Sequence, residues 1–190
     1  MNDNSGLVFL EITNIGEGLK EFRLNRRYLD GVAINLKEVN LLELRNSLKP
    51  EYLKELHVVL ILGVEGYDEG IDEVVKLLGK EGIEALLAFS NTQNLSLSKP
   101  KLPNTVKVGV MLNHPASTLS PYQRAGAKFI VMPPTLVRGR ILSESKARKI
   151  NIIARLVNDV AICTTLLEAG VYAIVTTIPT IRRDARKKLR

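Results

Sequence analysis

Short runs of apolar residues recur along the whole chain, separated by polar or amphipathic stretches. Eight of these runs have the length expected of buried strands. They are Leu7–Ile12, Gly31–Leu36, His57–Val64, Glu84–Phe89, Thr105–Leu112, Ala127–Met132, Val160–Thr165 and Val171–Thr177. Most are continuously apolar instead of alternating, so we expect both faces to be covered, as in a parallel sheet.

The intervening segments predict helices of unequal length. Helical periodicity or a helix-starting proline marks Leu19–Tyr28, about Asn40–Leu56 with Pro50 interrupting it, residues 66–82, Ser120–Ala125, about Ser143–Asn158 and Thr180–Arg190. The irregular segment Ser90–Asn104 is expected to be a loop or a replaced helix. The clearest unit joins the strand Ala127–Met132, the basic loop Pro133–Arg140, the helix Ser143–Asn158 and the strand Val160–Thr165.

Eight strands alternating with helices predict a compact (β/α)8 barrel. The 190 residues would form one domain, 1–190, with a basic C-terminal helix at 180–190. A unit of about 24 residues is short for this fold, so several helices should be clipped. An open doubly wound sheet is the alternative, but the turn after the first strand has only Gly16 and Gly18 of a dinucleotide fingerprint, with Glu21 at the third glycine position.

Positive charge is concentrated in the last third of the chain. Residues 1–120 contain 13 Lys+Arg against 16 Asp+Glu, whereas residues 121–190 contain 14 against 4. These net charges of −3 and +10 make up the overall +7. Such asymmetry favours a polyanionic partner, nucleic acid first and an acidic protein or membrane surface after it.

The single cysteine and the lack of a signal-peptide pattern indicate where in the cell the protein is expected. Cys163 lies in an apolar run and is expected to be a small buried hydrophobe. The chain shows no signal-peptide pattern, and its apolar runs fall short of the ~20 residues that span a bilayer. We therefore expect a soluble cytoplasmic protein without membrane association.

Catalytic groups of such a barrel come from the carboxyl ends of the strands. Glu11, Glu65 and His114 make an imaginable cluster there, although no metal-ligand spacing supports it. Thr164, Thr165 and Thr177 could contact an anion near the last two strands, without the open glycine turn typical of phosphate sites. We expect no cofactor, no metal and no catalytic residue from these patterns, and whether the rim is an active site stays open.

Cations make a stronger pattern. Arg138 and Arg140 flank a glycine, and Arg148 and Arg155 share the polar face of the helix that is predicted over 143–158. The predicted RNA-binding residues are Arg138, Arg140, Lys146, Arg148, Lys149, Arg155, Arg182, Arg183, Arg186, Lys187, Lys188 and Arg190. Because the chain has no tryptophan and few aromatics, contact with folded RNA or a duplex backbone fits better than base stacking.

The close of the chain, AIVTTIP followed by TIRRDARKKLR, resembles that of the archaeal ribonuclease P protein component 3 family, as does AKFIVMPP with its basic loop. That resemblance implies a non-catalytic subunit that stabilises a catalytic RNA during removal of 5′ leaders from precursor tRNA. Its partners would be structured RNA and other protein subunits of the complex.

Three functions follow from these patterns. The first is the RNA-binding subunit of a tRNA-processing ribonucleoprotein. The second is a barrel enzyme that acts on a phosphorylated metabolite, with Thr164, Thr165 and Thr177 contacting the anion. The third is a scaffold whose acidic first two-thirds binds a basic partner.

Overall fold

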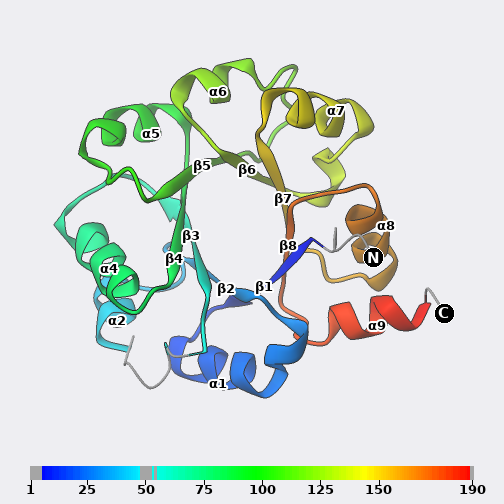
Figure 1. Ribbon diagram of the computed structural model, residues 1–190, viewed down its shortest axis with the longest axis horizontal. Helices are drawn as coiled ribbons and strands as arrows, with labels where there is room; N and C mark the ends of the chain where they lie inside the picture. Colours follow the sequence, from blue (N-terminus) through cyan, green and yellow to red (C-terminus); the bar gives the residue numbers. More distant parts are fainter. Residues whose placement is uncertain (1–5, 48–52, 54, 189–190) are drawn as a thin grey trace.

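The chain folds into a parallel β-barrel ringed by helices (Figure 1). The computed structural model describes residues 6–47, 53 and 55–188, and for 186–188 the backbone alone. Within this part of the chain the strands close in sequence order, and β8 pairs with β1 through Leu7 and Ala173. The predicted (β/α)8 barrel is confirmed.

The strands match the predicted apolar runs closely, with one exception. Their bounds are β1 (Leu7–Ile12), β2 (Gly31–Asn35), β3 (Val58–Val64), β4 (Glu84–Phe89), β5 (Lys107–Met111), β6 (Phe129–Met132), β7 (Asn151–Arg155) and β8 (Ala173–Thr176).

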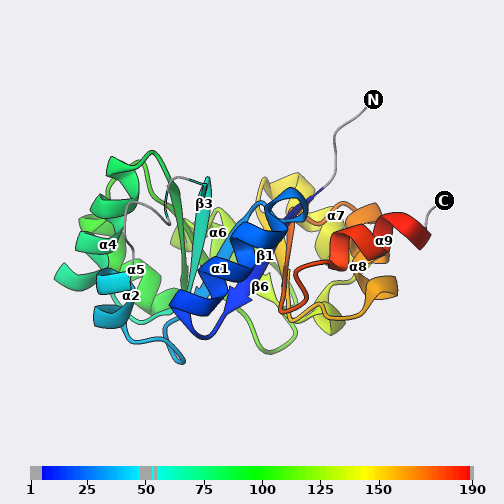
Figure 2. The same cartoon turned by 90° about the horizontal axis from the view of Figure 1, so that it is seen from below.

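The helices lie outside the barrel, and several are short (Figures 1 and 2). They are α1 (Ile15–Asn25), α2 (Leu41–Ser47), α4 (Glu69–Lys80), α5 (Thr92–Ser98), α6 (Ser120–Ala125), α7 (Gly139–Arg148), α8 (Val160–Glu168) and α9 (Ile181–Lys188). The described residues also contain the 3₁₀ turns η1 (Arg26–Tyr28), η2 (Lys99–Lys101) and η3 (Pro134–Leu136). The irregular segment 90–104 therefore holds a short helix, and the expected clipping of helices is confirmed. Pro50, the predicted helix interruption, lies outside the described residues.

Continuous apolar strands are explained by two cores. One fills the barrel, with Phe9, Leu60 and Ile153 among its members. The other lies between the sheet and the helices and takes the alternate strand positions, such as Val8 and Ile152. Because successive side chains of a strand point to opposite faces, a strand buried on both faces has no polar alternation.

The predicted seventh strand is wrong. Val160–Thr165 belongs to α8, whose first turn is capped by Asp159, which accepts hydrogen bonds from the backbone N–H groups of Ala161 and Ile162. Cys163 is buried as expected, but in this helix and not in a strand.

The true seventh strand lies inside the predicted helix 143–158. Lys149 adopts a left-handed conformation (φ 55°) that ends α7, and β7 begins at Asn151. The apolar spacing of Ile150, Ile153, Ala154 and Val157 fits a helix face, but Ile152 and Ile153 are β-branched residues in a run that is buried on both sides. The predicted number of strands is still correct, because the seventh strand was predicted at the wrong position in the sequence and no strand of the closed barrel was missing.

None of the helices in the described part of the chain combines the length and the apolar character that a membrane crossing requires.

Candidate active site

A buried ion pair lies at the carboxyl end of the barrel. Glu11 is the last residue but one of β1 and Arg155 is the last residue of β7. Both occupy inward-facing positions, on the two strands that flank β8. Arg155 Nε donates to both carboxylate oxygens of Glu11, at 3.2 and 3.1 Å, and Nη2 donates to Oε1 as well. The Glu11 side chain is only 3% exposed, so the pair combines strong charge-assisted hydrogen bonds with restricted access to water.

The residue after Arg155 is strained. Leu156 has φ 63°, in the left-handed region that a side chain with a Cβ occupies at a cost of about 1–2 kcal/mol. Its side chain is also exposed (53%). Strained residues of this kind often occur at binding and catalytic sites, where the rest of the fold holds them in place.

A small hollow of about 50 Å³ opens beside the ion pair. Met111, Asn113, Pro133, Arg155 and Leu156 line it together with three neighbouring strand-end residues. It therefore lies at the ends of β5, β6 and β7, where barrel enzymes carry their reacting groups.

A second, cationic recess of about 130 Å³ adjoins the first, since both are lined by Met132. Its polar lining consists of His114, from the loop after β5, and Arg138 and Arg140, from the start of α7. A Cβ placed on Gly139 would meet no atom within 4 Å, so an anion can approach the backbone between the two arginines. We call this hollow, with His114, Arg138 and Arg140 as its polar lining, the cationic recess.

Three hydrogen bonds fix the loop after β5 against α7. Arg140 Nη2 donates to the Ser117 carbonyl at 2.9 Å. Glu144, one turn further along α7, accepts hydrogen bonds from the Thr118 hydroxyl (2.6 Å) and from the Leu119 N–H (2.9 Å). These bonds, together with Arg148, lower the pKa of Glu144 from 4.5 to about 2. The loop that carries His114 is thus held in register with the helix that carries the arginines.

The opposite side of the mouth is lined by polar side chains. Glu65 accepts hydrogen bonds from the Ser90 hydroxyl and the Asn94 amide, each at 2.6 Å. Asn35, buried at the end of β2, donates to Glu38 at 3.2 Å. These side chains complete a rim of hydrogen-bonding groups around the barrel.

The imagined cluster of Glu11, Glu65 and His114 does not form. Glu11 binds Arg155, Glu65 binds Ser90 and Asn94, and His114 lies in the cationic recess. In residues 6–47, 53 and 55–188, no three histidine, cysteine, aspartate or glutamate side chains come together in a way that could hold a metal ion.

The predicted threonine anion site is also wrong. Thr164 and Thr165 lie within α8, where their hydroxyls donate to the carbonyls of Val160 and Ala161. Thr177 does follow a strand, but its N–H donates to the Asn158 side chain at 3.0 Å. The error follows from the misplaced seventh strand, which would have put Thr164 and Thr165 at the barrel mouth.

The residues predicted to bind RNA are scattered over both ends of the barrel. Arg138, Arg140 and Arg155 lie at the carboxyl end. By contrast, Arg182 is buried at the opposite end, where it donates to the Gly6 carbonyl (2.6 Å) and to Asp30 (2.7 Å).

Several of these cations pair with carboxylates of the same chain. Arg148 binds Glu144 at 2.6 Å and Arg183 binds Asp184 at 3.0 Å, in addition to the pairs of Arg155 and Arg182. Lys146 and Lys149 are exposed. The side chains of Arg186, Lys187 and Lys188, and all of Arg190, lie outside the described residues.

The sequence patterns correctly placed Glu11 near the end of a strand and His114 in the loop after a strand, but they did not identify Arg155 as a barrel-mouth residue. They assigned Arg155 to a solvent-facing helix. The β-branched run Ile152–Ile153, ended by a charged residue, was the signal that could have identified the strand.

Comparisons with known proteins extend the fold assignment. No protein-family model matches the chain, and no curated protein matches it in sequence. Among solved structures, a phosphodiesterase of Oleispira antarctica, in complex with its product sn-glycerol-3-phosphate, is similar at 14% identity with a TM-score of 0.68. The match covers 95% of this chain and 96% of that one.

A glycerophosphodiester phosphodiesterase of Parabacteroides distasonis is similar at 10% identity with a TM-score of 0.65, over 98% of this chain and 100% of that one. A structure from Silicibacter pomeroyi, described as a glycerophosphoryl diester phosphodiesterase, has a TM-score of 0.61 at 14% identity. It matches over 74% of this chain, which spans 56% of its length.

These similarities correct the first functional hypothesis. An RNA-binding subunit of a tRNA-processing ribonucleoprotein is not supported. The similar structures named above are described as phosphodiesterases, and several of the proposed RNA contacts within the described residues lie at opposite ends of the barrel or pair with carboxylates of the chain. At 10–14% identity, what the comparisons establish for this chain is the fold it shares with these enzymes.

Proposed function

We propose that this protein is a small barrel enzyme that acts on a phosphorylated metabolite. The observation that carries the proposal is the cationic recess beside the Glu11–Arg155 pair, at the end of the barrel where such enzymes react. The similarity to phosphodiesterase structures supports it and makes hydrolysis of a phosphate ester the first reaction to test.

The recess suits a phosphate group in charge and size. Arg138 and Arg140 offer guanidinium donors, which bind phosphate oxygens in a bidentate manner. His114 and the backbone around Gly139 add further donors. A volume of about 130 Å³ is several times the ~30 Å³ that one water occupies in the liquid, so it holds a phosphate and leaves the rest of the metabolite over the barrel mouth.

The Glu11–Arg155 pair is then placed next to the ester. When an anionic substrate engages Arg155, the Glu11 carboxylate loses part of its hydrogen bonding and can then accept a proton, for example from an attacking water. A carboxylate in a site with little water is suited to general acid–base chemistry. Leu156, held in a strained conformation beside Arg155, offers an exposed apolar surface to the organic part of the substrate.

Binding of phosphate compounds tests the proposal directly. Isothermal titration with sn-glycerol 3-phosphate and inorganic phosphate should show binding that weakens at least tenfold in Arg138→Ala/Arg140→Ala, because two charge-assisted hydrogen-bond donors are lost. Lys80→Ala/Lys101→Ala removes the same charge from exposed positions away from the mouth and should leave binding unchanged.

Hydrolysis of a chromogenic phosphodiester should likewise fall in Glu11→Gln. Equal weakening in both double variants, or no binding by wild type at millimolar ligand, would overturn the proposal.

A further inference from the structure

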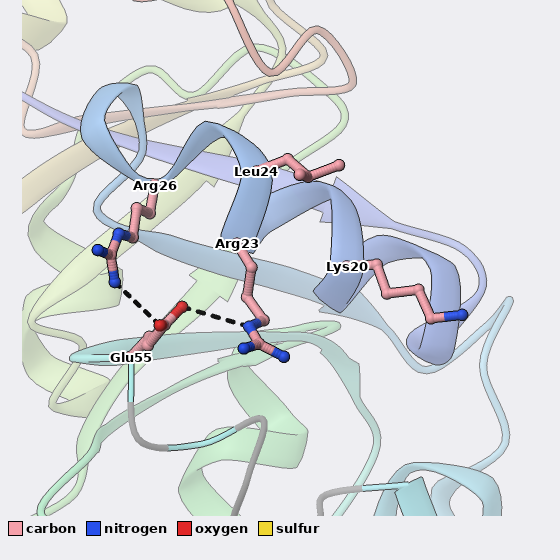
Figure 3. A pocket seen from close by; sticks show the side chains of 5 residues that line it. All are labelled: Lys20, Arg23, Leu24, Arg26 and Glu55. Atoms are coloured by element: carbon pink, nitrogen blue, oxygen red, sulfur yellow. Dashed lines mark hydrogen bonds and ion pairs between the residues drawn. The ribbon is translucent and has the colours of Figure 1, made fainter.

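A wide groove lies along α1, at the other end of the barrel from the mouth. About 500 Å³ in volume, it is lined by Lys20, Arg23, Leu24, Arg26 and Glu55 (Figure 3). It adjoins a second hollow of about 390 Å³, since both are lined by Arg26 and Glu55. The second hollow reaches Asp30 and His57, which precede β2 and β3, so the groove follows the amino-terminal end of the strands.

Cations dominate this groove although it belongs to the acidic part of the chain. Lys20, Arg23, Leu24 and Arg27 follow the spacing i, i+3, i+4, i+7 and therefore share one side of α1 and its η1 extension. Arg183 of α9 extends the positive charge further, since both Arg27 and Arg183 lie over the Tyr28 ring, at 4.8 and 5.8 Å. Folding thus joins cations from the two ends of the chain.

Glu55 organises the arginines without neutralising them. It accepts from Arg26 Nη1 at 2.9 Å and pairs with Arg23 Nε at 3.4 Å, and Figure 3 shows both side chains pointing toward it. Each guanidinium carries five N–H donors, so one carboxylate engages a minority of them and leaves the others able to bind an incoming anion. The two cations are therefore held apart at fixed positions on the groove.

Leu24 is the apolar part of the same surface. It is 83% exposed and, in Figure 3, points away from Glu55, between the positions of Lys20 and Arg26 on the helix. Arg23 and Arg26 remain 46% and 62% exposed at their side chains, so the groove is open and not an enclosed small-molecule pocket.

We propose that the α1 groove binds an acidic amphipathic helix of a partner protein. Its glutamates or aspartates would meet Lys20, Arg23 and Arg26, and an apolar residue would cover Leu24. An exposed leucine among the cations favours a peptide over a nucleic acid backbone, which has no apolar group to place there. The carboxylate of Glu55 opposes a continuous row of phosphates, whereas separate peptide carboxylates can avoid it.

A model peptide tests this inference independently of catalysis. The probe is a fluorescein-labelled 16-residue helical peptide with leucines on one face and glutamates elsewhere, measured by fluorescence anisotropy at low and high salt. Wild type should bind it, with affinity falling as salt rises, and the peptide with glutamine in place of glutamate should not bind.

Three variants separate the contributions. Arg23→Ala/Arg26→Ala should weaken binding at least tenfold, Leu24→Ser about threefold, and the charge-matched Lys80→Ala/Lys101→Ala not at all. The proposal is overturned if the glutamate peptide does not bind, or if the control double variant weakens it equally. It is also overturned if a single-stranded oligonucleotide binds the wild type as tightly as the peptide does and Leu24→Ser leaves the affinity for the peptide unchanged.

Discussion

Two arginines with little exposed surface, one at each end of the barrel, show how the same interaction serves different purposes. Arg155 pairs with Glu11 at the carboxyl end, beside two hollows and a strained leucine. Arg182 pairs with Asp30 at the amino end and also donates to the Gly6 carbonyl, so it ties α9 to the first strands. Burial and pairing are common to both, and only the surroundings distinguish a candidate active-site pair from a structural one.

The hydrogen bonds of each pair agree with this distinction. Asp30 also accepts from the Val8 N–H at 2.7 Å, so Arg182 belongs to a network that includes the backbone of β1. The hydrogen bonds between Arg155 and Glu11, by contrast, join side chain to side chain. They lie next to the hollow at the barrel mouth. Loss of the Arg182–Asp30 pair should damage the fold, whereas loss of the Arg155–Glu11 pair should damage ligand binding.

The largest effect is expected for Arg182→Met, which keeps the apolar stem and removes the charge. The Gly6 carbonyl and Asp30 then lose their donor, and we expect a loss of about 3 kcal/mol in the free energy of unfolding, measured by urea denaturation. Arg183→Met, on the same helix but 41% exposed, is the control and should cost under ~1 kcal/mol. Similar losses in the two variants would contradict a structural role specific to Arg182.

An intermediate effect is expected when both members of the other pair are replaced. Glu11→Leu/Arg155→Met should stay within about 1 kcal/mol of wild type in stability, because an apolar pair avoids the desolvation of two buried charges. Binding of sn-glycerol 3-phosphate, followed by isothermal titration, should nevertheless fall at least tenfold. If the double variant unfolds as readily as Arg182→Met and still binds the ligand, the contrast between the two pairs is wrong.

The smallest effect concerns Glu144, which fixes the loop of the cationic recess. Its pKa of about 2 in the folded protein lies below its usual 4.5, so ionised Glu144 contributes stability above about pH 4.5 that is lost as the pH falls toward 2. Glu144→Gln should therefore unfold at a temperature that depends less on pH in that window, as measured by circular dichroism. Glu168→Gln, an exposed position on α8, should keep the wild-type pH dependence.

The charge pattern illustrates where sequence reasoning stopped. The excess of cations after residue 120 is real, but those whose side chains the structure describes do not form one surface: Arg138 and Arg140 line the mouth, whereas Arg182 is buried at the far end. Conversely, the cations of α1, in the acidic part of the chain, line a groove. Side chains distant in sequence are brought together or separated by the fold, and counting along the chain cannot show which.

The sequence by itself favoured the barrel and determined seven of its eight strands within a few residues. Runs such as Val58–Val64 and Glu84–Phe89 are short and uniformly apolar, as expected of strands covered on both faces, and their number and spacing indicated the eightfold unit. It also placed Glu11 at a strand end. Its weakest point was Asn151–Arg155, where apolar residues fit a helix and a strand equally well and only the ending of α7 at Lys149 decided between them.

Only the tertiary structure decided the candidate site. Glu11 and Arg155 are 144 residues apart in sequence and meet because β1 and β7 flank β8 in the closed sheet. His114 joins Arg138 and Arg140 because Glu144 binds the loop after β5 to α7. The local sequence pattern indicates whether a side chain is buried. Closure of the barrel determines which charged side chains come into contact, and the chemistry of the site depends on those contacts.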